Sequence, residues 1–261
     1  MLTLFNIITM ISLTNMKKRE GGLARLSFSQ KNSGGFTLLE LLIVIAIIAI
    51  LSIALVFMLN PAETLKKARD AQRISDLKSV KTALGIMLTA SSTPNLDSGR
   101  AVCSTNTVGA TLTPKISYSA FPAPTTIGGT DAGADSANGT AFSDTGDSSV
   151  NATSTGKVDG SGWIPVNLKA LTGGTPISSF PVDPVNSVTA AVVPTDLVYR
   201  YACQNLSLTA GKPSYIFELN AKLESNAYTV EDNKQANDGG DNAAMYETGN
   251  SLNLLPATGN F

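Results

Sequence analysis

Histidine is absent from the 261 residues of the chain. It is the commonest general base, the usual partner of a catalytic serine and a frequent zinc ligand, so its absence removes the simplest routes to hydrolytic and metal chemistry. Carboxylates are plentiful, with 20 Asp and Glu residues, and two of them could serve glycosidic cleavage. Because no paired motif singles out two such residues, the sequence does not favour an enzyme.

Charge is nearly absent from one long segment. Between Gly35 and Leu59 the chain reads G-F-T-L-L-E-L-L-I-V-I-A-I-I-A-I-L-S-I-A-L-V-F-M-L, in which Glu40 is the single ionisable residue. A helix of this length can cross a bilayer at about 1.5 Å per residue. A carboxylate inside it costs about 2.5 to 3.5 kcal/mol at mid-membrane depth and less near the end, so we expect Glu40 to have a function.

The sign of the charge changes along the chain. Residues 1–35 carry five Lys and Arg residues against one Glu, out of 19 basic and 20 acidic residues, so the remainder holds 14 basic and 19 acidic residues, a net charge of −5. Basic residues on the N-terminal flank of an apolar helix mark the cytoplasmic side. The sequence therefore predicts a single-pass protein of the cytoplasmic (inner) membrane with an extracytoplasmic C-terminal domain.

Cysteine occurs only twice, at Cys103 and Cys203. In an oxidising compartment a disulfide is the default expectation, and closing a loop of about 100 residues would contribute roughly 4 to 5 kcal/mol. The alternative is a pair of buried, unpaired thiols.

The N-terminal segments follow an order that differs from a secretory signal, in which the cleavage site comes after the apolar part. Here the small pair Gly34-Gly35 precedes the apolar part. Cleavage there would remove a basic leader, residues 1–35, and leave the helix with a new amino terminus at Phe36. Residues 1–15 are apolar, so either translation starts at Met16 or the leader is unusually long.

The motif G-F-T-L-L-E followed by the apolar helix resembles the prepilin signature of type IV pilins and of the pseudopilins of type II secretion systems. The resemblance implies a structural subunit that a prepilin peptidase cleaves after Gly35 and methylates at Phe36. It also implies that Glu40 pairs with the amino terminus of a neighbouring subunit and sets register, while the helix dipole favours a carboxylate in the first turn. The other interpretation is that Glu40 only reaches the headgroups from the end of an anchor.

The resemblance implies several partners as well. They are copies of the chain and related pilins, the prepilin peptidase, an assembly platform in the inner membrane, and membrane lipid before assembly. Nucleic-acid binding is left open. After assembly the subunit would lie in an extracellular or periplasmic filament.

The helix is expected to continue beyond the membrane with a change of direction. Pro61 predicts a kink, because proline lacks a backbone donor and disfavours helix at the preceding residue. We expect a membrane-spanning and filament-core helix at 36–60 and an amphipathic helix at 61–89. Its apolar stripe comprises Leu77, Val80, Leu84 and Met87. The charge run from Lys66 to Arg73 could contact neighbouring subunits or anionic lipid headgroups, but a solvated helix face is the favoured interpretation.

Composition separates the remainder into two parts. Residues 90–162 are rich in Ser, Thr, Gly, Ala, Asp and Asn, which predicts a surface loop. Glycosylation sequons at Asn138, Asn151 and Asn205 are weak signals in such sequence. In the pilin plan, Cys103 would tie the start of this loop to the sheet.

Residues 163–261 contain the strand signals. Alternating segments at 196–203 and 214–220 predict an antiparallel sheet whose apolar face covers the helix stripe. The predicted fold class is therefore α+β, with a long bent N-terminal helix packed on a C-terminal antiparallel β-sheet and a long irregular loop between them. We expect Trp163 to be a core residue.

Residues 230–247 form an acidic segment that is predicted to be a loop. Asp232, Asp238, Asp241 and Glu247 lie among glycines, and such oxygen ligands could hold calcium, as some pseudopilins do in a C-terminal loop. Their spacing does not match an EF-hand, and acidic loops of this kind are usually solvated. No other cofactor is expected.

The predicted function is that of a structural subunit of a type IV pilus or pseudopilus. The alternative is a single-span membrane-anchored surface protein with an extracellular ligand-binding domain. That alternative explains the apolar run but not the order of Gly35, Phe36 and Glu40. Whether the filament serves adhesion, motility, DNA uptake or secretion is left open.

Overall fold

A computed structural model describes residues 34–107, 110–111, 114–120, 126–127, 147, 153–188, 191–207 and 214–258. Most of the predicted leader and the sequons at Asn138 and Asn151 lie outside the described residues. The chain divides after Ile53 into two compact units. Each unit is described by itself.

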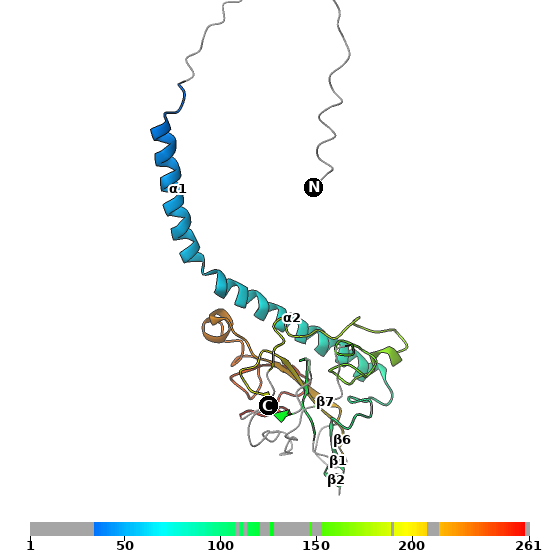
Figure 1. Ribbon diagram of the computed structural model, residues 1–261. Helices are drawn as coiled ribbons and strands as arrows, with labels where there is room; N and C mark the ends of the chain where they lie inside the picture. The colour runs from blue at the N-terminus through cyan, green and yellow to red at the C-terminus, as the bar shows by residue number, and fades with distance from the viewer. Residues whose placement is uncertain are drawn as a thin grey trace, which may run out of the picture. The chain divides into compact units, whose positions relative to one another are not determined.

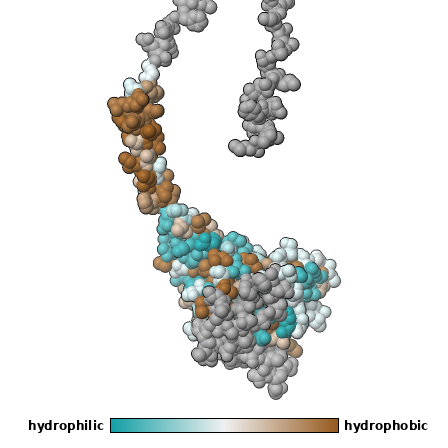
Figure 2. Space-filling model, in the orientation of Figure 1, coloured by the Kyte–Doolittle hydropathy of each residue, from teal (hydrophilic) through white to brown (hydrophobic). Residues whose placement is uncertain are grey.

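Helix α1, Leu38–Leu59, is apolar on every side. Its surface forms a brown column in the space-filling view of Figure 2. No residue of α1 is buried in the structure. Its 22 residues span about 33 Å, which matches the roughly 30 Å hydrocarbon core of a bilayer.

The helix breaks at one residue, Asn60, and resumes as α2, Pro61–Ala90 (Figure 1). Asn60 has φ 38° and ψ 70°, a left-handed conformation that Asn tolerates better than most residues. Its side-chain oxygen accepts a hydrogen bond from the Glu63 amide at 3.4 Å. Pro61 is the first residue of α2, where a missing N–H costs nothing. The predicted change of direction therefore arises from Asn60 and Pro61 together.

Within its described residues, the second unit contains a six-stranded sheet in the order β2-β1-β6-β7-β8, with β3 also paired to β6. The strands are β1 Ser104–Thr107, β2 Ala110–Thr111, β3 Ser117–Tyr118, β6 Tyr199–Ser207, β7 Ile216–Ala221 and β8 Tyr246–Gly249. Strands β6 and β7 are antiparallel, as predicted, and β3 and β8 pair with them as further antiparallel strands. Strand β1 runs parallel to the second half of β6. A separate two-stranded parallel sheet joins β4, Thr126–Ile127, to β5, Ala191–Val192.

The sheet has a buried core on each of its faces. On one face the helix stripe of Leu77, Val80, Leu84 and Met87 shares a cluster with residues that include Trp163, Tyr199, Tyr201, Phe217 and Leu219. This packing confirms the predicted stripe, the strand alternation and the core position of Trp163. The other face buries a second cluster that includes Ile116, Ala202, Ile216, Leu254 and Leu255. The sequence did not predict that second core.

Order within residues 90–162 is greater than their composition suggested. The described part of this range contains β1 to β4, none longer than four residues. Leu96, Ile116 and Tyr118 from this range are buried. Strands this short need few apolar residues, so a low apolar content does not exclude them. Strand β8 similarly begins inside the predicted acidic loop, at Tyr246.

Candidate functional site

The segment before α1 is a capped helix start. The Glu40 amide donates to Oγ1 of Thr37 at 3.2 Å, and the Leu41 amide donates to the Thr37 carbonyl at 3.2 Å. Thr37 is therefore the N-cap, and α1 begins at Leu38 rather than at Phe36. Our sequence interpretation missed Thr37, although T-x-x-E is the sequence pattern of a capping box.

The predicted processing residues lie just outside the helix. Gly34, Gly35 and Phe36 have no regular secondary structure, and the Phe36 side chain is 81% exposed. A Cβ atom added to Gly34 or Gly35 would meet no heavy atom within 4 Å. Neither glycine is required by packing in the described chain.

Glu40 lies two residues into an otherwise uncharged helix, and its residue is exposed. The other polar side chain of α1 is that of Ser52, whose hydroxyl donates to the Ile48 carbonyl at 2.7 Å. The carboxylate of Glu40 is therefore the one charged group on this surface. Among the described residues, one helical region, Leu38–Ala90, contains a window long and apolar enough to cross a membrane, and α1 is its apolar part.

A buried ionic cluster fixes α2 to two distant segments of the chain. The guanidinium of Arg73 donates to both carboxylate oxygens of Asp183, at 2.6 and 3.0 Å. It also donates to Asp70 at 2.7 Å and to Glu224 at 2.8 Å. Arg73 and Asp70 are fully buried. The expectation that the charge run of α2 is a solvated face is therefore wrong for these two residues.

Two backbone segments are held by the same carboxylates. Asp70 accepts hydrogen bonds from the amides of Glu224 and Ser225, and Asp183 accepts from those of Val185 and Asn186. Hydrogen bonds from Arg69 and then Arg73 lower the pKa of Glu224 to about 2. The cluster fixes α2 against both segments through charge-assisted bonds.

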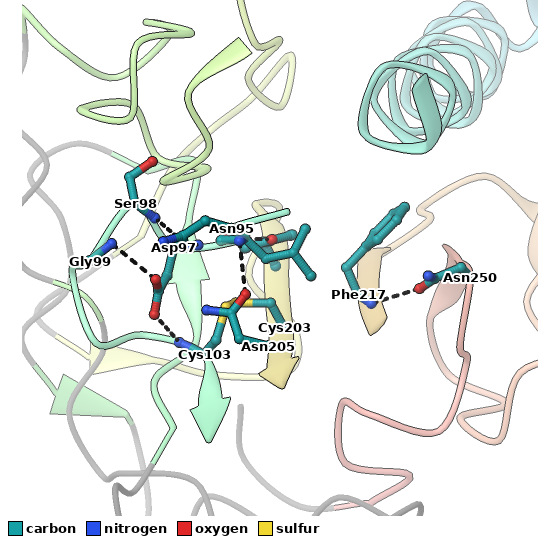
Figure 3. The surroundings of a disulfide bond; sticks show 11 residues. Asn95, Asp97, Ser98, Gly99, Cys103, Cys203, Asn205, Phe217 and Asn250 are labelled. Atoms are coloured by element: carbon teal, nitrogen blue, oxygen red, sulfur yellow. Dashed lines mark hydrogen bonds between the residues drawn. A yellow bond between two sulfur atoms is a disulfide. The ribbon is translucent and has the colours of Figure 1, made fainter. Parts of the chain in front are cut away.

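Cys103 and Cys203 form a disulfide between the residue before β1 and the middle of β6. Figure 3 shows the hydrogen bonds that stabilise the loop beside this disulfide. The carboxylate of Asp97 accepts from the amides of Gly99 and Cys103, and Asn205 Oδ1 accepts from the Leu96 amide at 2.9 Å. The disulfide joins the start of the predicted loop to the sheet, as the resemblance to pilins implied.

The predicted calcium residues are only partly brought together. Asp238 accepts hydrogen bonds from the amides of Gly240 and Glu247, whereas Asp232 pairs with Lys234 at 2.7 Å and Asp241 is exposed. No group of three or more His, Cys, Asp or Glu residues suited to a metal occurs among the described residues. Calcium binding at this loop stays a prediction.

One of these residues belongs to a different arrangement. Glu247 lies beside Glu218 on the neighbouring strand β7, and both are buried. Glu218 accepts from the amides of Leu254 and Leu255, at 2.7 and 2.8 Å. Burial, with the neighbouring carboxyl group, raises the pKa of Glu218 well above its usual range, and burial raises that of Glu247 to about 7. Such a pair holds a proton at neutral pH.

The capped apolar helix α1, followed by an α+β unit, fits the class of membrane-anchored proteins. Within that class, residues 30–56 match the family described as prokaryotic N-terminal methylation motif. This motif is the signature of type IV pilins and pseudopilins, and together with the apolar helix α1 it supports a type IV pilin-like protein. Comparisons with curated proteins and with solved structures gave no match.

Proposed function

We propose that the chain is a structural subunit of a type IV pilus or pseudopilus, processed between Gly35 and Phe36 and assembled through α1. The observation that carries the proposal is the order of its N-terminal features. A glycine that packing does not require is followed by a capped apolar helix whose only ionisable residue is Glu40. An anchor alone needs neither the glycine nor the acid.

The absence of contacts around Gly35 supports recognition by a peptidase. Neither a close approach nor a left-handed backbone accounts for the glycine there, since an added Cβ meets open space. A requirement for glycine would then come from the active site of an enzyme that holds this segment in extended form.

The role proposed for Glu40 follows from the cost of burying charge. When α1 leaves the bilayer and packs among other helices, the carboxylate loses its contact with water or headgroups, and an unpaired charge is then strongly unfavourable. Cleavage creates an amino group at Phe36, four residues earlier in the sequence. The amino terminus of a neighbouring subunit is a cation at a suitable depth, so pairing with it would select one register.

The rest of α1 would drive assembly without exposure to water. The apolar side chains of the helix move from lipid to the filament interior, and their surface stays out of water at each stage. The α+β unit remains outside the membrane. No catalytic role is assigned to any residue of the chain.

The alternative, a single-span surface protein that uses α1 only as an anchor, makes a different prediction for Glu40. We expect Glu40→Ala to insert into the membrane normally and to be lost from filaments, since its partner charge would be left unpaired. Ser52→Ala removes the other polar side chain discussed above from the same helix and is the matched control. Wild-type incorporation of Glu40→Ala would overturn the assembly role.

The processing step is tested by mass spectrometry of the mature amino terminus in cells that contain a prepilin peptidase. We expect a chain that begins with methylated Phe36. Gly35→Val should block cleavage without changing the fold, because the added side chain meets open space, and Gly34→Ala serves as the control. A mature chain that begins upstream of Phe36, or downstream of Leu59, would refute the proposal.

A further inference from the structure

Exposed apolar side chains lie beside the first turns of α2, outside the membrane helix itself. Val230 is 72% exposed and Leu65 is 61% exposed. Among the large apolar side chains that the structure describes after the end of α1, these two are the most exposed. Exposed apolar surface of this kind commonly marks a contact with a partner or a membrane.

Val230 belongs to η2, Ala227–Glu231, a single π-helical turn. Figure 1 shows this turn as an orange coil next to the beginning of α2. Within the turn, the Asp232 amide donates to the Ala227 carbonyl at 2.9 Å, and the Lys234 amide donates to the Tyr228 carbonyl at 2.8 Å. The turn is therefore a defined element of structure.

Three contacts fix η2 against α2. The Asn226 amide donates to the carboxylate of Glu63, and Arg69 makes two hydrogen bonds to Glu224, at 2.7 and 2.8 Å. The ammonium group of Lys67 lies 5.9 Å from the centre of the Tyr228 ring, within the range of a cation–π interaction. The turn thus lies opposite the segment from Glu63 to Lys67.

That segment begins immediately after the apolar helix. Residues 54–59, the last of α1, belong to the same compact unit as α2 and η2. At about 1.5 Å per residue, Glu63 and Lys67 lie about 6 and 12 Å beyond Leu59 along the helix path. The polar interface on each side of a bilayer is roughly 5 to 7 Å thick, so η2 begins at the depth of the headgroups.

We propose that Leu65 and Val230, beside the half-buried Tyr228, form a second membrane contact, which rests on the phospholipid surface beside the point where α1 emerges. Tyrosine is enriched at the depth of the headgroups. The charges of these two segments balance in number, because Lys66 and Lys67 are matched by Glu63 and Glu231, and Lys234 pairs with Asp232. The contact therefore does not require anionic lipid.

This contact would fix how the α+β unit meets the membrane before the subunit is withdrawn into a filament. The inference rests on the proposed function only in requiring that α1 spans the bilayer. The same apolar side chains could instead contact a neighbouring subunit. The experiment below distinguishes contact with lipid from contact with a subunit.

The test uses the full-length chain in phosphatidylcholine vesicles whose acyl chains carry bromine near the headgroup. Val230→Trp introduces an emitter on η2, and the native Trp163, which is fully buried, supplies a constant background measured in the unsubstituted protein. Leu206→Trp is the matched control. Its side chain is 47% exposed, and the adjacent Asn205 bonds Leu96, which follows the distant C-terminal end of α2. Ile48→Trp reports on the membrane span.

We expect bromine to reduce the added emission of Val230→Trp by about twofold and to leave that of Leu206→Trp unchanged. Quenching of Ile48→Trp without quenching of Val230→Trp would overturn the membrane contact while the span stands. If Ile48→Trp is not quenched either, the result refutes both the proposal that α1 spans the bilayer and the proposed membrane contact. Loss of filament incorporation by Val230→Asp, with no quenching of Val230→Trp, would assign the patch to a neighbouring subunit and overturn the proposal.

Discussion

Arg73→Met removes the buried guanidinium that joins α2 to two distant parts of the chain. The substitution keeps an unbranched side chain that fits a helix but deletes four hydrogen bonds to three carboxylates. Asp70 and Asp183, exposed by 0% and 2%, would keep their backbone bonds but lose their compensating charge.

The size of the effect follows from that burial. Removing one partner of a buried ion pair typically costs about 3 to 5 kcal/mol, because the remaining charge is left in a medium of low polarisability. Arg69→Met is the matched control, one turn earlier on the same helix. Its side chain is 33% exposed and binds one carboxylate, so we expect a loss of about 1 kcal/mol or less.

The measurement is unfolding of the full-length protein in detergent by guanidinium chloride, followed by Trp163 fluorescence. Trp163 is fully buried, and its indole N–H donates to the Pro181 carbonyl at 2.9 Å, so it reports on the core next to Asp183. The free energy of unfolding should fall about 3 kcal/mol or more for Arg73→Met. A loss no larger than that of Arg69→Met would refute the reasoning that burial makes this cluster important.

Four further predictions follow from the same structure. Because Arg69 and Arg73 lower the pKa of folded Glu224 from 4.5 to about 2, its contribution to stability is present above pH 4.5 and lost as pH falls toward 2; Glu224→Gln should flatten this acid limb in unfolding measured against pH, and an unchanged limb would contradict it. Burial raises the pKa of folded Glu247 from 4.5 to about 7, so its contribution is lost as pH rises from 4.5 through 7; Glu247→Gln should reduce that decline, which thermal unfolding at pH 5 and pH 8 would detect, and an equal decline in the variant would contradict it. Replacing both Cys103 and Cys203 by Ser opens a loop with a sequence separation of 100 and should lower the free energy of unfolding by roughly 4 to 5 kcal/mol; a change below about 1 kcal/mol would be inconsistent with loop closure. Calcium binding at the acidic loop is checked by calorimetric titration of the full-length protein, with heat that Asp238→Asn removes and Asp159→Asn keeps; absence of heat in the wild type would reject the site.

Features that depend on neighbouring residues were predictable from the sequence. The apolar run of α1, the break before Pro61 and the stripe from Leu77 to Met87 all appear in the structure. Each is set by the local preferences of consecutive side chains, and a one-dimensional pattern records these preferences directly. The alternation of side chains between the two faces of β6 and β7 was predictable for the same reason.

Features that depend on long-range contacts were not predictable in the same way. Arg73 and Asp183 are 110 positions apart, and nothing near either residue distinguishes a buried partner from a solvated charge. The parallel pairing of β1 with β6 and the core on the second sheet face involve strands as short as two residues. Such strands carry too few residues to show a period.

The sequence by itself determined that this protein has an apolar N-terminal helix with one acid near its start, preceded by a pair of glycines. Only the tertiary structure decided which charges of α2 are buried and where η2 lies relative to the end of that helix. The physical reason is that hydropathy is a property of each residue, whereas the fate of a charge depends on which distant groups the fold brings within hydrogen-bonding distance.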